Sequence, residues 1–136
     1  MAQPTETQIG ELVTAARIAR EKAYAPYSDF TVGAAILAGG KVYAGCNVEN
    51  ASYGLSICAE RNAATTAVAA GERRFDAVAV VGSSADPTPP CGACRQFLYE
   101  FGPDMRVIAE TPDGRRETWG MDEVLPHAFG PQHLAE

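Results

Sequence analysis

Three cysteines and one glutamate, placed in two short motifs, are the strongest constraint on how this chain can fold. Cys58 stands two residues before Glu60, and the second motif is Cys91-Gly92-Ala93-Cys94. A catalytic zinc ion is held by three protein ligands and keeps a fourth, tetrahedral position open. Three thiolates satisfy that requirement, so the sequence predicts a fold that brings two distant segments onto one Zn²⁺ ion.

Both motifs lie where a helix is expected to begin. Pro89-Pro90 gives a stiff approach to a helix that starts at Cys91. The run 59–70 is rich in alanine, the best helix former, and Gly71 is expected to end it. The positive end of a helix dipole stabilises a thiolate. We therefore expect two helix N-termini to meet at the metal.

Glu60 and Arg61 follow Cys58 directly enough to act on the same site. Glu60 can reach a water molecule at the metal if the ion lies off the end of the helix. Three thiolates and Zn²⁺ carry a net charge of minus one. Arg61 can offset this charge by donating hydrogen bonds to the sulfurs, and this role is a hypothesis.

Other interpretations of the cysteines remain open from the residues alone. A C-x-x-C pair also occurs in structural zinc sites and in redox pairs. Cys46 could complete a closed four-cysteine site, but it stands in the strand-like run 42–48 and is expected to be a small buried core residue. A structural site has no need of Glu60. His127 and His133 are not needed as ligands, because three cysteines fill the protein positions.

Length and charge narrow the class of protein. The 136 residues predict one domain, 1–136, and the hydrophobic fraction of 46% is that of an ordinary globular chain. The net charge of −6 argues against a nucleic-acid partner, since nucleic-acid binders usually carry a basic patch. No basic, apolar leader or bilayer-length apolar run is visible. We expect no membrane association and a cytoplasmic location, where four cysteines need not form disulfides.

Hydrophobic periodicity predicts alternating helices and strands. Thr5 to Gln8 has capping-box spacing before an amphipathic helix that ends before Pro26. Gly39-Gly40 suits a tight hairpin, and the short turn 112–114 permits only an antiparallel return. After the first helix we expect strands at 30–37 and 41–48, a helix at 58–70, a doubly buried strand at 77–81, a helix from 91, strands at 105–109 and 115–119, and a short helix at 121–125.

The two cysteine motifs resemble the signature of cytidine deaminases of the short, three-cysteine type. The matching residues are Cys58-Ala59-Glu60-Arg61 together with Pro90-Cys91-Gly92-Ala93-Cys94. The resemblance continues through three further stretches, 27–35, 45–54 and 125–129, and so covers nearly the whole chain. It implies an α/β fold of three layers, α/β/α, in which a five-stranded mixed sheet has helices on both faces.

The same resemblance implies an activity and an assembly. The expected reaction is zinc-dependent hydrolytic deamination of cytidine and 2′-deoxycytidine in pyrimidine salvage, and the expected assembly is a homotetramer. A deaminase of modified nucleosides or nucleoside antibiotics would share the zinc site and differ in its ribose-binding residues. A structural zinc module would bind metal without turnover. A nucleic-acid deaminase is disfavoured by the acidic charge and the short turn at 112–114.

Individual site roles also follow from the resemblance, position by position. It implies that Glu60 is catalytic, that Cys58, Cys91 and Cys94 bind the metal and that Arg61 supports them. The substrate-binding positions match Phe30, Asn47, Glu49 and Ala59, of which Phe30 would pack against the pyrimidine ring and Asn47 and Glu49 would hydrogen-bond the ribose hydroxyls. Tyr53 and Phe129 match positions that reach an active site from a neighbouring subunit.

Overall fold

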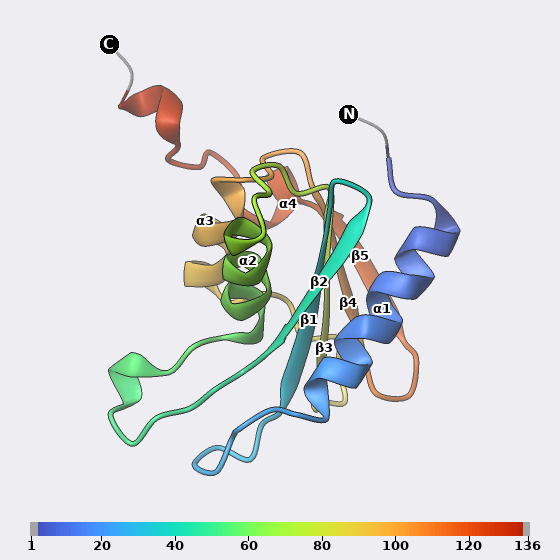
Figure 1. The fold of residues 1–136 in the computed structure, drawn as a ribbon, viewed down its shortest axis with the longest axis vertical. Coiled ribbons are helices and arrows are strands. Elements are labelled where there is room, and N and C mark those ends of the chain that lie inside the picture. The colour runs from blue at the N-terminus through green and yellow to red at the C-terminus, as the bar shows by residue number, and fades with distance from the viewer. Residues whose placement is uncertain (1–2, 135–136) are drawn as a thin grey trace.

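The computed structural model describes residues 3–134, so residues 1–2 and 135–136 lie outside the described part of the chain. A five-stranded mixed sheet in the order β2-β1-β3-β4-β5 forms its centre (Figure 1). β1 is antiparallel to β2 and β3, β3 is parallel to β4, and β4 is antiparallel to β5. The strands are β1 Val32–Ala38, β2 Lys41–Cys46, β3 Ala77–Gly82, β4 Arg106–Glu110 and β5 Arg116–Gly120.

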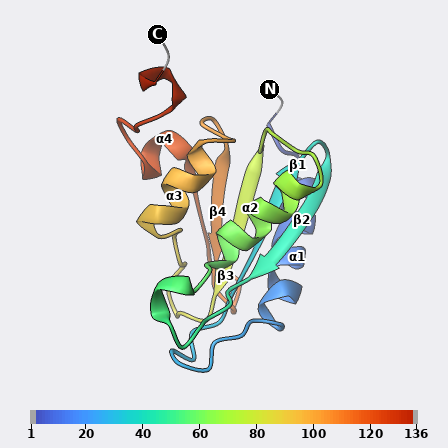
Figure 2. The same cartoon turned by 60° about the vertical axis from the view of Figure 1, so that its left-hand side comes forward.

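Helices cover both faces of this sheet, which confirms the predicted three-layer α/β fold. They are α1 Glu6–Arg20, α2 Ala59–Ala69, α3 Gly92–Tyr99 and the short α4 Met121–Val124, with 3₁₀ turns η1 Tyr53–Leu55 and η2 Pro131–His133. α1 packs on one face against β1, β2 and β3, whereas α2 and α3 lie on the other (Figure 2). Each face buries its own apolar cluster.

Local signals set the first helix and the first hairpin. The Thr5 side chain accepts a hydrogen bond from the Gln8 N–H while the Gln8 side chain accepts one from the Thr5 N–H, which confirms the capping box. Gly39 and Gly40 have φ of 59° and 76°, the left-handed values that a tight two-residue hairpin requires. β1 begins at Val32 rather than at the predicted residue 30, because the preceding segment is an irregular loop.

Close contact with the sheet fixes α2, the helix that carries one side of the site. Ala63, Ala64 and Ala67 are completely buried, as their spacing predicts, whereas Ala70 lies exposed at the end of the helix. A Cβ atom on Gly45 of β2 would lie 2.5 Å from the Ala63 backbone nitrogen. Small side chains therefore let α2 approach the sheet and hold its N-terminus in place.

The second half of the chain forms the β3-α3-β4 unit and a closing hairpin. All six residues of β3 are buried, as expected for a strand covered on both faces. The turn after β4 returns β5 antiparallel to it, which confirms the prediction from its length. Among the described residues, no helix has the length and apolar character to cross a bilayer.

Candidate metal and catalytic site

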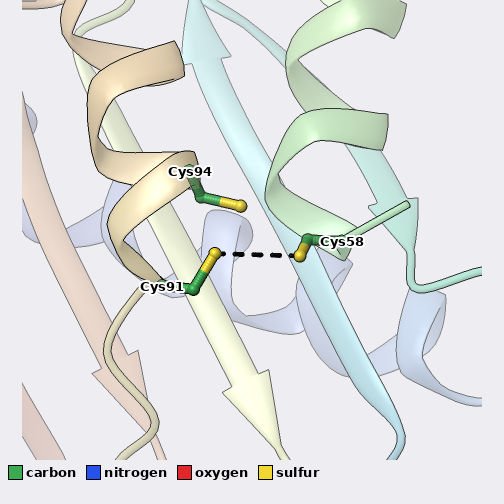
Figure 3. Close-up of side chains that lie close together, drawn as sticks. All are labelled: Cys58, Cys91 and Cys94. Atoms are coloured by element: carbon green, nitrogen blue, oxygen red, sulfur yellow. Dashed lines mark hydrogen bonds between the residues drawn. The ribbon is translucent and has the colours of Figure 1, made fainter. Parts of the chain in front are cut away.

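The sulfur atoms of Cys58, Cys91 and Cys94 converge between the starts of α2 and α3 (Figure 3). Cys58 is the N-cap residue of α2, Cys91 is the N-cap residue of α3, and Cys94 follows in the first turn of α3. The three Sγ atoms lie within 4.8 Å of one another, and those of Cys58 and Cys91 are 3.9 Å apart. The fold therefore brings together the two motifs as their sequence predicts.

This donor set fits tetrahedral zinc. Zn–S bonds of about 2.3 Å place two thiolates of a tetrahedral site about 3.8 Å apart. The Sγ separation of 3.9 Å between Cys58 and Cys91 agrees with that value. Cys94 is buried and Cys91 is exposed, so the group has a protected side and an accessible side. Three sulfurs leave the fourth position for water or substrate.

The protein environment favours a thiolate at Cys58. Its pKa is lowered to about 5, first by a hydrogen bond from the Cys94 thiol and then by hydrogen bonds from Arg61 and Cys91. The partner thiol shows the opposite effect: the pKa of Cys94 is raised by its hydrogen bond to Cys58 and by burial. Zinc binds cysteine as the thiolate, so the lowered pKa of Cys58 favours the form that binds the metal.

Arg61 lies beside these sulfurs. Its Nη2 atom is 3.6 Å from the Cys58 Sγ, and the pKa of Arg61 is raised, chiefly by this contact. Its Nε atom is buried and has no hydrogen-bond partner among the described residues. The guanidinium group is thus placed to offset the negative charge of a zinc tris-thiolate.

Glu60 is buried in the first turn of α2, with 5% of its surface exposed. Burial raises the pKa of its carboxyl group to about 7, and the negative charge of Cys58 adds to this effect. The backbone N–H of Cys91 and the Arg61 guanidinium act in the opposite direction. A carboxyl group with a pKa near neutrality can both accept and donate a proton under ordinary conditions.

Asn47 and Glu49 follow β2 and hold the loop that precedes β1. The Asn47 amide accepts a hydrogen bond from the Val32 N–H and donates one to the Phe30 carbonyl, both at 2.8 Å. The Glu49 carboxylate accepts the N–H groups of Tyr27 and Ser28 at 3.0 and 3.1 Å, and the Ser28 hydroxyl as well. Both side chains therefore fix the backbone around Phe30.

The other predicted substrate positions divide into buried and exposed groups. Ala59 is completely buried between Cys58 and Glu60, whereas Phe30 is 37% exposed. Tyr53 and Phe129 are 74% and 57% exposed. Tyr53 also lines a cavity of about 260 Å³ together with Tyr27, Ser28, Glu49 and Ser56.

The remaining candidate ligands lie outside the sulfur cluster. Among residues 3–134, the metal-compatible group contains neither histidine nor Cys46. The prediction that Cys46 is a buried core residue is wrong: it is half-buried at the end of an edge strand, and its Sγ is 3.5 Å from the Lys22 carbonyl. An edge strand is covered less completely than a central one, which sequence periodicity does not reveal.

The sequence alone indicates no role for two residues near the site. Ser28 lies in one of the stretches that carry the resemblance, and it provides two of the contacts to Glu49. Thr88 has a buried hydroxyl oxygen without a hydrogen-bond partner among the described residues. It lies against Gly82, beside the Phe30 ring. The only available signal was its position three residues before Cys91.

Comparisons with known proteins agree on one family. Residues 6–111 match the family model described as the cytidine and deoxycytidylate deaminase zinc-binding region. A cytidine deaminase of Halalkalibacterium halodurans is 48% identical over 125 residues, covering 90% of this chain and 95% of the relative. One of Sporosarcina psychrophila is 44% identical over 129 residues, covering 93% and 95%.

Solved structures show the same relationship. The crystal structure of a cytidine deaminase from Burkholderia pseudomallei is 52% identical with a TM-score of 0.85, covering 88% of this chain and 98% of that one. A cytidine deaminase structure from Mycobacterium tuberculosis is 40% identical with a TM-score of 0.78, covering 90% and 97%. The structural likeness therefore covers most of the chain, and the family model at 6–111 includes both cysteine motifs.

Proposed function

The chain belongs to the cytidine and deoxycytidylate deaminase family and is a zinc-dependent hydrolase, and we propose the following roles for its residues in the deamination of cytidine and 2′-deoxycytidine. The reaction consumes water and releases ammonia, giving uridine or 2′-deoxyuridine. The observation that carries the assignment of roles is the convergence of three cysteine sulfurs beside the buried Glu60.

Cys58, Cys91 and Cys94 would hold the Zn²⁺ ion, and Arg61 would support Cys58 from outside the cluster. A bound Zn²⁺ ion would supply Lewis acidity, which makes water more acidic near neutral pH. The buried Cys94 and the exposed Cys91 leave one side of the group open for a substrate to approach.

Glu60 would carry the protons of the reaction. Its carboxylate accepts a proton from the attacking water and passes it to ring nitrogen N3 of the pyrimidine. When the bond from C4 to the amino group breaks, Glu60 delivers the second proton of the water to the departing amine. The raised pKa of Glu60, caused mainly by burial, suits a group that must take up and release protons in turn.

The nucleoside would be recognised by residues that already organise this end of the fold. Phe30 would pack against the pyrimidine ring, and its backbone is fixed by Asn47. Asn47 and Glu49 would hydrogen-bond the ribose through the donor and acceptor positions that their loop contacts leave unused. The Ala59 backbone, at the start of α2 beside Glu60, would contact the base.

A homotetramer would complete the site. Tyr53 and Phe129 are large aromatic residues that remain mostly exposed, and aromatic residues are enriched at protein interfaces. Each would enter the active site of a neighbouring copy, as the resemblance implies. Light scattering tests the assembly, and a fully active monomer would remove this part of the proposal.

The deciding experiment follows the ultraviolet change as cytidine becomes uridine, with ammonia release and zinc content measured on the same sample. Glu60→Gln keeps the side-chain shape and loses the proton carrier, so we expect turnover to fall by at least ~10²-fold with zinc retained. Glu11→Gln, an exposed change on α1, is the matched control. Near-normal turnover of a zinc-loaded Glu60→Gln variant would overturn the role of Glu60.

A further inference from the structure

The segment after α4 leads away from the sheet toward the C-terminus, as both ribbon views show (Figures 1 and 2). Phe129, in this segment, is 57% exposed, yet its ring stacks on another ring of the chain. The His133 ring stacks on it, with ring centroids 5.2 Å apart and planes inclined by 15°. The stack thus gives an exposed aromatic ring in this segment a packing partner.

A hydrogen bond fixes the His133 ring in turn. His133 closes the 3₁₀ turn η2, and its Nδ1 atom accepts the N–H of Gly130 at 3.0 Å. The bond joins His133 to the residue directly after Phe129. The imidazole therefore contributes two separate interactions, a stacked ring and a hydrogen-bond acceptor, to the same short segment.

Two contacts seat this segment on α3, the helix that begins at the Cys91–Cys94 motif. The Gln96 side-chain amide donates a hydrogen bond to the Phe129 carbonyl at 2.8 Å. Gly130 is buried, and a Cβ atom there would lie 2.8 Å from the Tyr99 ring. The position of the Phe129 backbone is thus tied to α3, while the direction of its ring depends on His133.

We infer that His133 is a positioning residue, which orients the Phe129 ring for insertion into the active site of a second copy of this chain. This inference rests on the cross-subunit role proposed for Phe129. Fixing the ring before association lowers the entropy that binding must overcome. Loss of His133 would leave the Phe129 backbone seated and its ring free to rotate away.

Three substitutions separate the two interactions of His133. His133→Asn keeps an acceptor oxygen near the Nδ1 position and removes the stacked ring, whereas His133→Phe keeps a ring and removes the acceptor. His133→Ala removes both. His127→Asn is the matched control, because it makes the same change at the other histidine, which adopts a left-handed φ of 53° that asparagine tolerates.

We expect His133→Ala to raise KM for cytidine by about 2- to 10-fold, the range set by an aromatic pair, with kcat nearly unchanged. The Asn and Phe variants should each restore part of the difference, and His127→Asn should match the unsubstituted protein. A merely structural role for His133 would instead lower thermal stability without this partial rescue.

An independent readout does not depend on activity. The chain has two histidines, so ¹³C-labelled histidine gives two sets of ring signals. The ring protons of His133 should be shifted upfield by the Phe129 ring, and Phe129→Ala should abolish the shift while leaving the His127 signals in place. Absence of any such shift in the zinc-loaded protein overturns the inference.

The activity of Phe129→Ala distinguishes failure of the inference from failure of the proposed assembly. If Phe129→Ala raises KM and His133→Ala does not, the positioning role is wrong and the cross-subunit role stands. If Phe129→Ala also leaves KM unchanged, both are wrong. Sedimentation of every variant shows whether an effect arises from loss of the oligomer instead.

Discussion

The Glu49 carboxylate and the Ser28 hydroxyl form a hydrogen bond between the end of β2 and the loop that leads to β1. The backbone N–H groups of Tyr27 and Ser28 also donate to Glu49. The Glu49 side chain, which we propose to bind ribose, therefore also stabilises the loop that carries Phe30. Contacts of this kind join substrate recognition to the local fold.

Ser28→Ala should raise the pKa of Glu49 toward its ordinary value. The Ser28 hydroxyl is the largest cause of the lowered pKa, because it stabilises the carboxylate. A carboxyl group with a lowered folded pKa contributes stability above its unfolded pKa and loses that contribution as the pH falls through the folded value. NMR titration of the Glu49 carboxyl carbon measures the change.

The acid limb of stability gives a second readout of the same pair. Because Glu49 loses part of its carboxylate stabilisation in Ser28→Ala, thermal stability should depend less on pH on the acid side in this variant. Ser56→Ala is the matched control, since Ser56 lines the same cavity and its hydroxyl instead accepts the Asn50 N–H. Equal Glu49 pKa values in all three proteins would show that Ser28 has no such effect.

Zinc content should separate the four cysteines into two groups. Cys58→Ala, Cys91→Ala and Cys94→Ala each remove one of the three converging sulfurs, so each should lose most of its zinc on dialysis. Cys46→Ser should keep one zinc per chain, because the Cys46 sulfur lies at the Lys22 carbonyl and outside the cluster. Metal analysis by plasma mass spectrometry measures the content.

Circular dichroism on the same samples shows whether zinc loss follows from unfolding. A folded Cys46→Ser variant without zinc would support the closed four-cysteine site that the sequence left open. Retention of zinc by a folded Cys94→Ala variant would argue against the three-sulfur site.

Much of the fold could be predicted because its signals are local. The capping box at Thr5 and the Gly39-Gly40 hairpin depend on residues a few positions apart, and both are present. The convergence of the cysteines could be predicted as well, since zinc chemistry requires it. These features need no knowledge of which strand neighbours which.

Features that depend on distant neighbours could not be predicted in the same way. Cys46 has strand-like surroundings in the sequence, but its partial exposure follows from the edge position of β2. The Ser28–Glu49 contact joins residues 21 positions apart, and the stack of His133 on Phe129 has no periodic pattern. Ionisation of Glu60 also depends on burial by the assembled fold.

Arg61→Gln should weaken zinc binding or turnover by about 10- to 100-fold, the usual effect of removing a group that supports a metal ligand. The substitution removes the charge that lies 3.6 Å from the Cys58 sulfur and keeps hydrogen-bonding capacity. Competition with a chromophoric chelator measures the affinity. Arg73→Gln is the matched control, because its guanidinium contacts the backbone carbonyls of Val68 and Glu72.

Arg61→Lys distinguishes charge from geometry. Lysine keeps the positive charge but lacks the planar guanidinium group. If charge alone matters, Arg61→Lys should restore most of the zinc affinity lost in Arg61→Gln. An Arg61→Gln protein with unchanged zinc affinity and turnover would show that the contact between Arg61 and Cys58 contributes to neither.

Gly82→Ala should disturb the proposed pyrimidine site by crowding Thr88 and the Phe30 ring. A Cβ atom at Gly82 would lie 2.4 Å from the Thr88 hydroxyl oxygen and 3.3 Å from the tip of the Phe30 ring. Overpacking of this kind typically costs about 1–3 kcal/mol. We expect lower thermal stability together with a higher KM for cytidine, because relief of the clash requires Thr88 or Phe30 to move.

A compensating change tests this cause directly. Thr88→Gly removes the side chain that the new methyl group meets first, so the double variant should recover part of the lost stability and affinity. Gly10→Ala is the matched control, since a Cβ atom there meets nothing within 4 Å and alanine favours the surrounding helix. If Gly82→Ala keeps its stability and KM, the new methyl group does not disturb the Phe30 ring, and the prediction is wrong. If it loses both without recovery in the double variant, the clash with Phe30 outweighs the one with Thr88, and crystallographic displacement of the Phe30 ring should then accompany the loss.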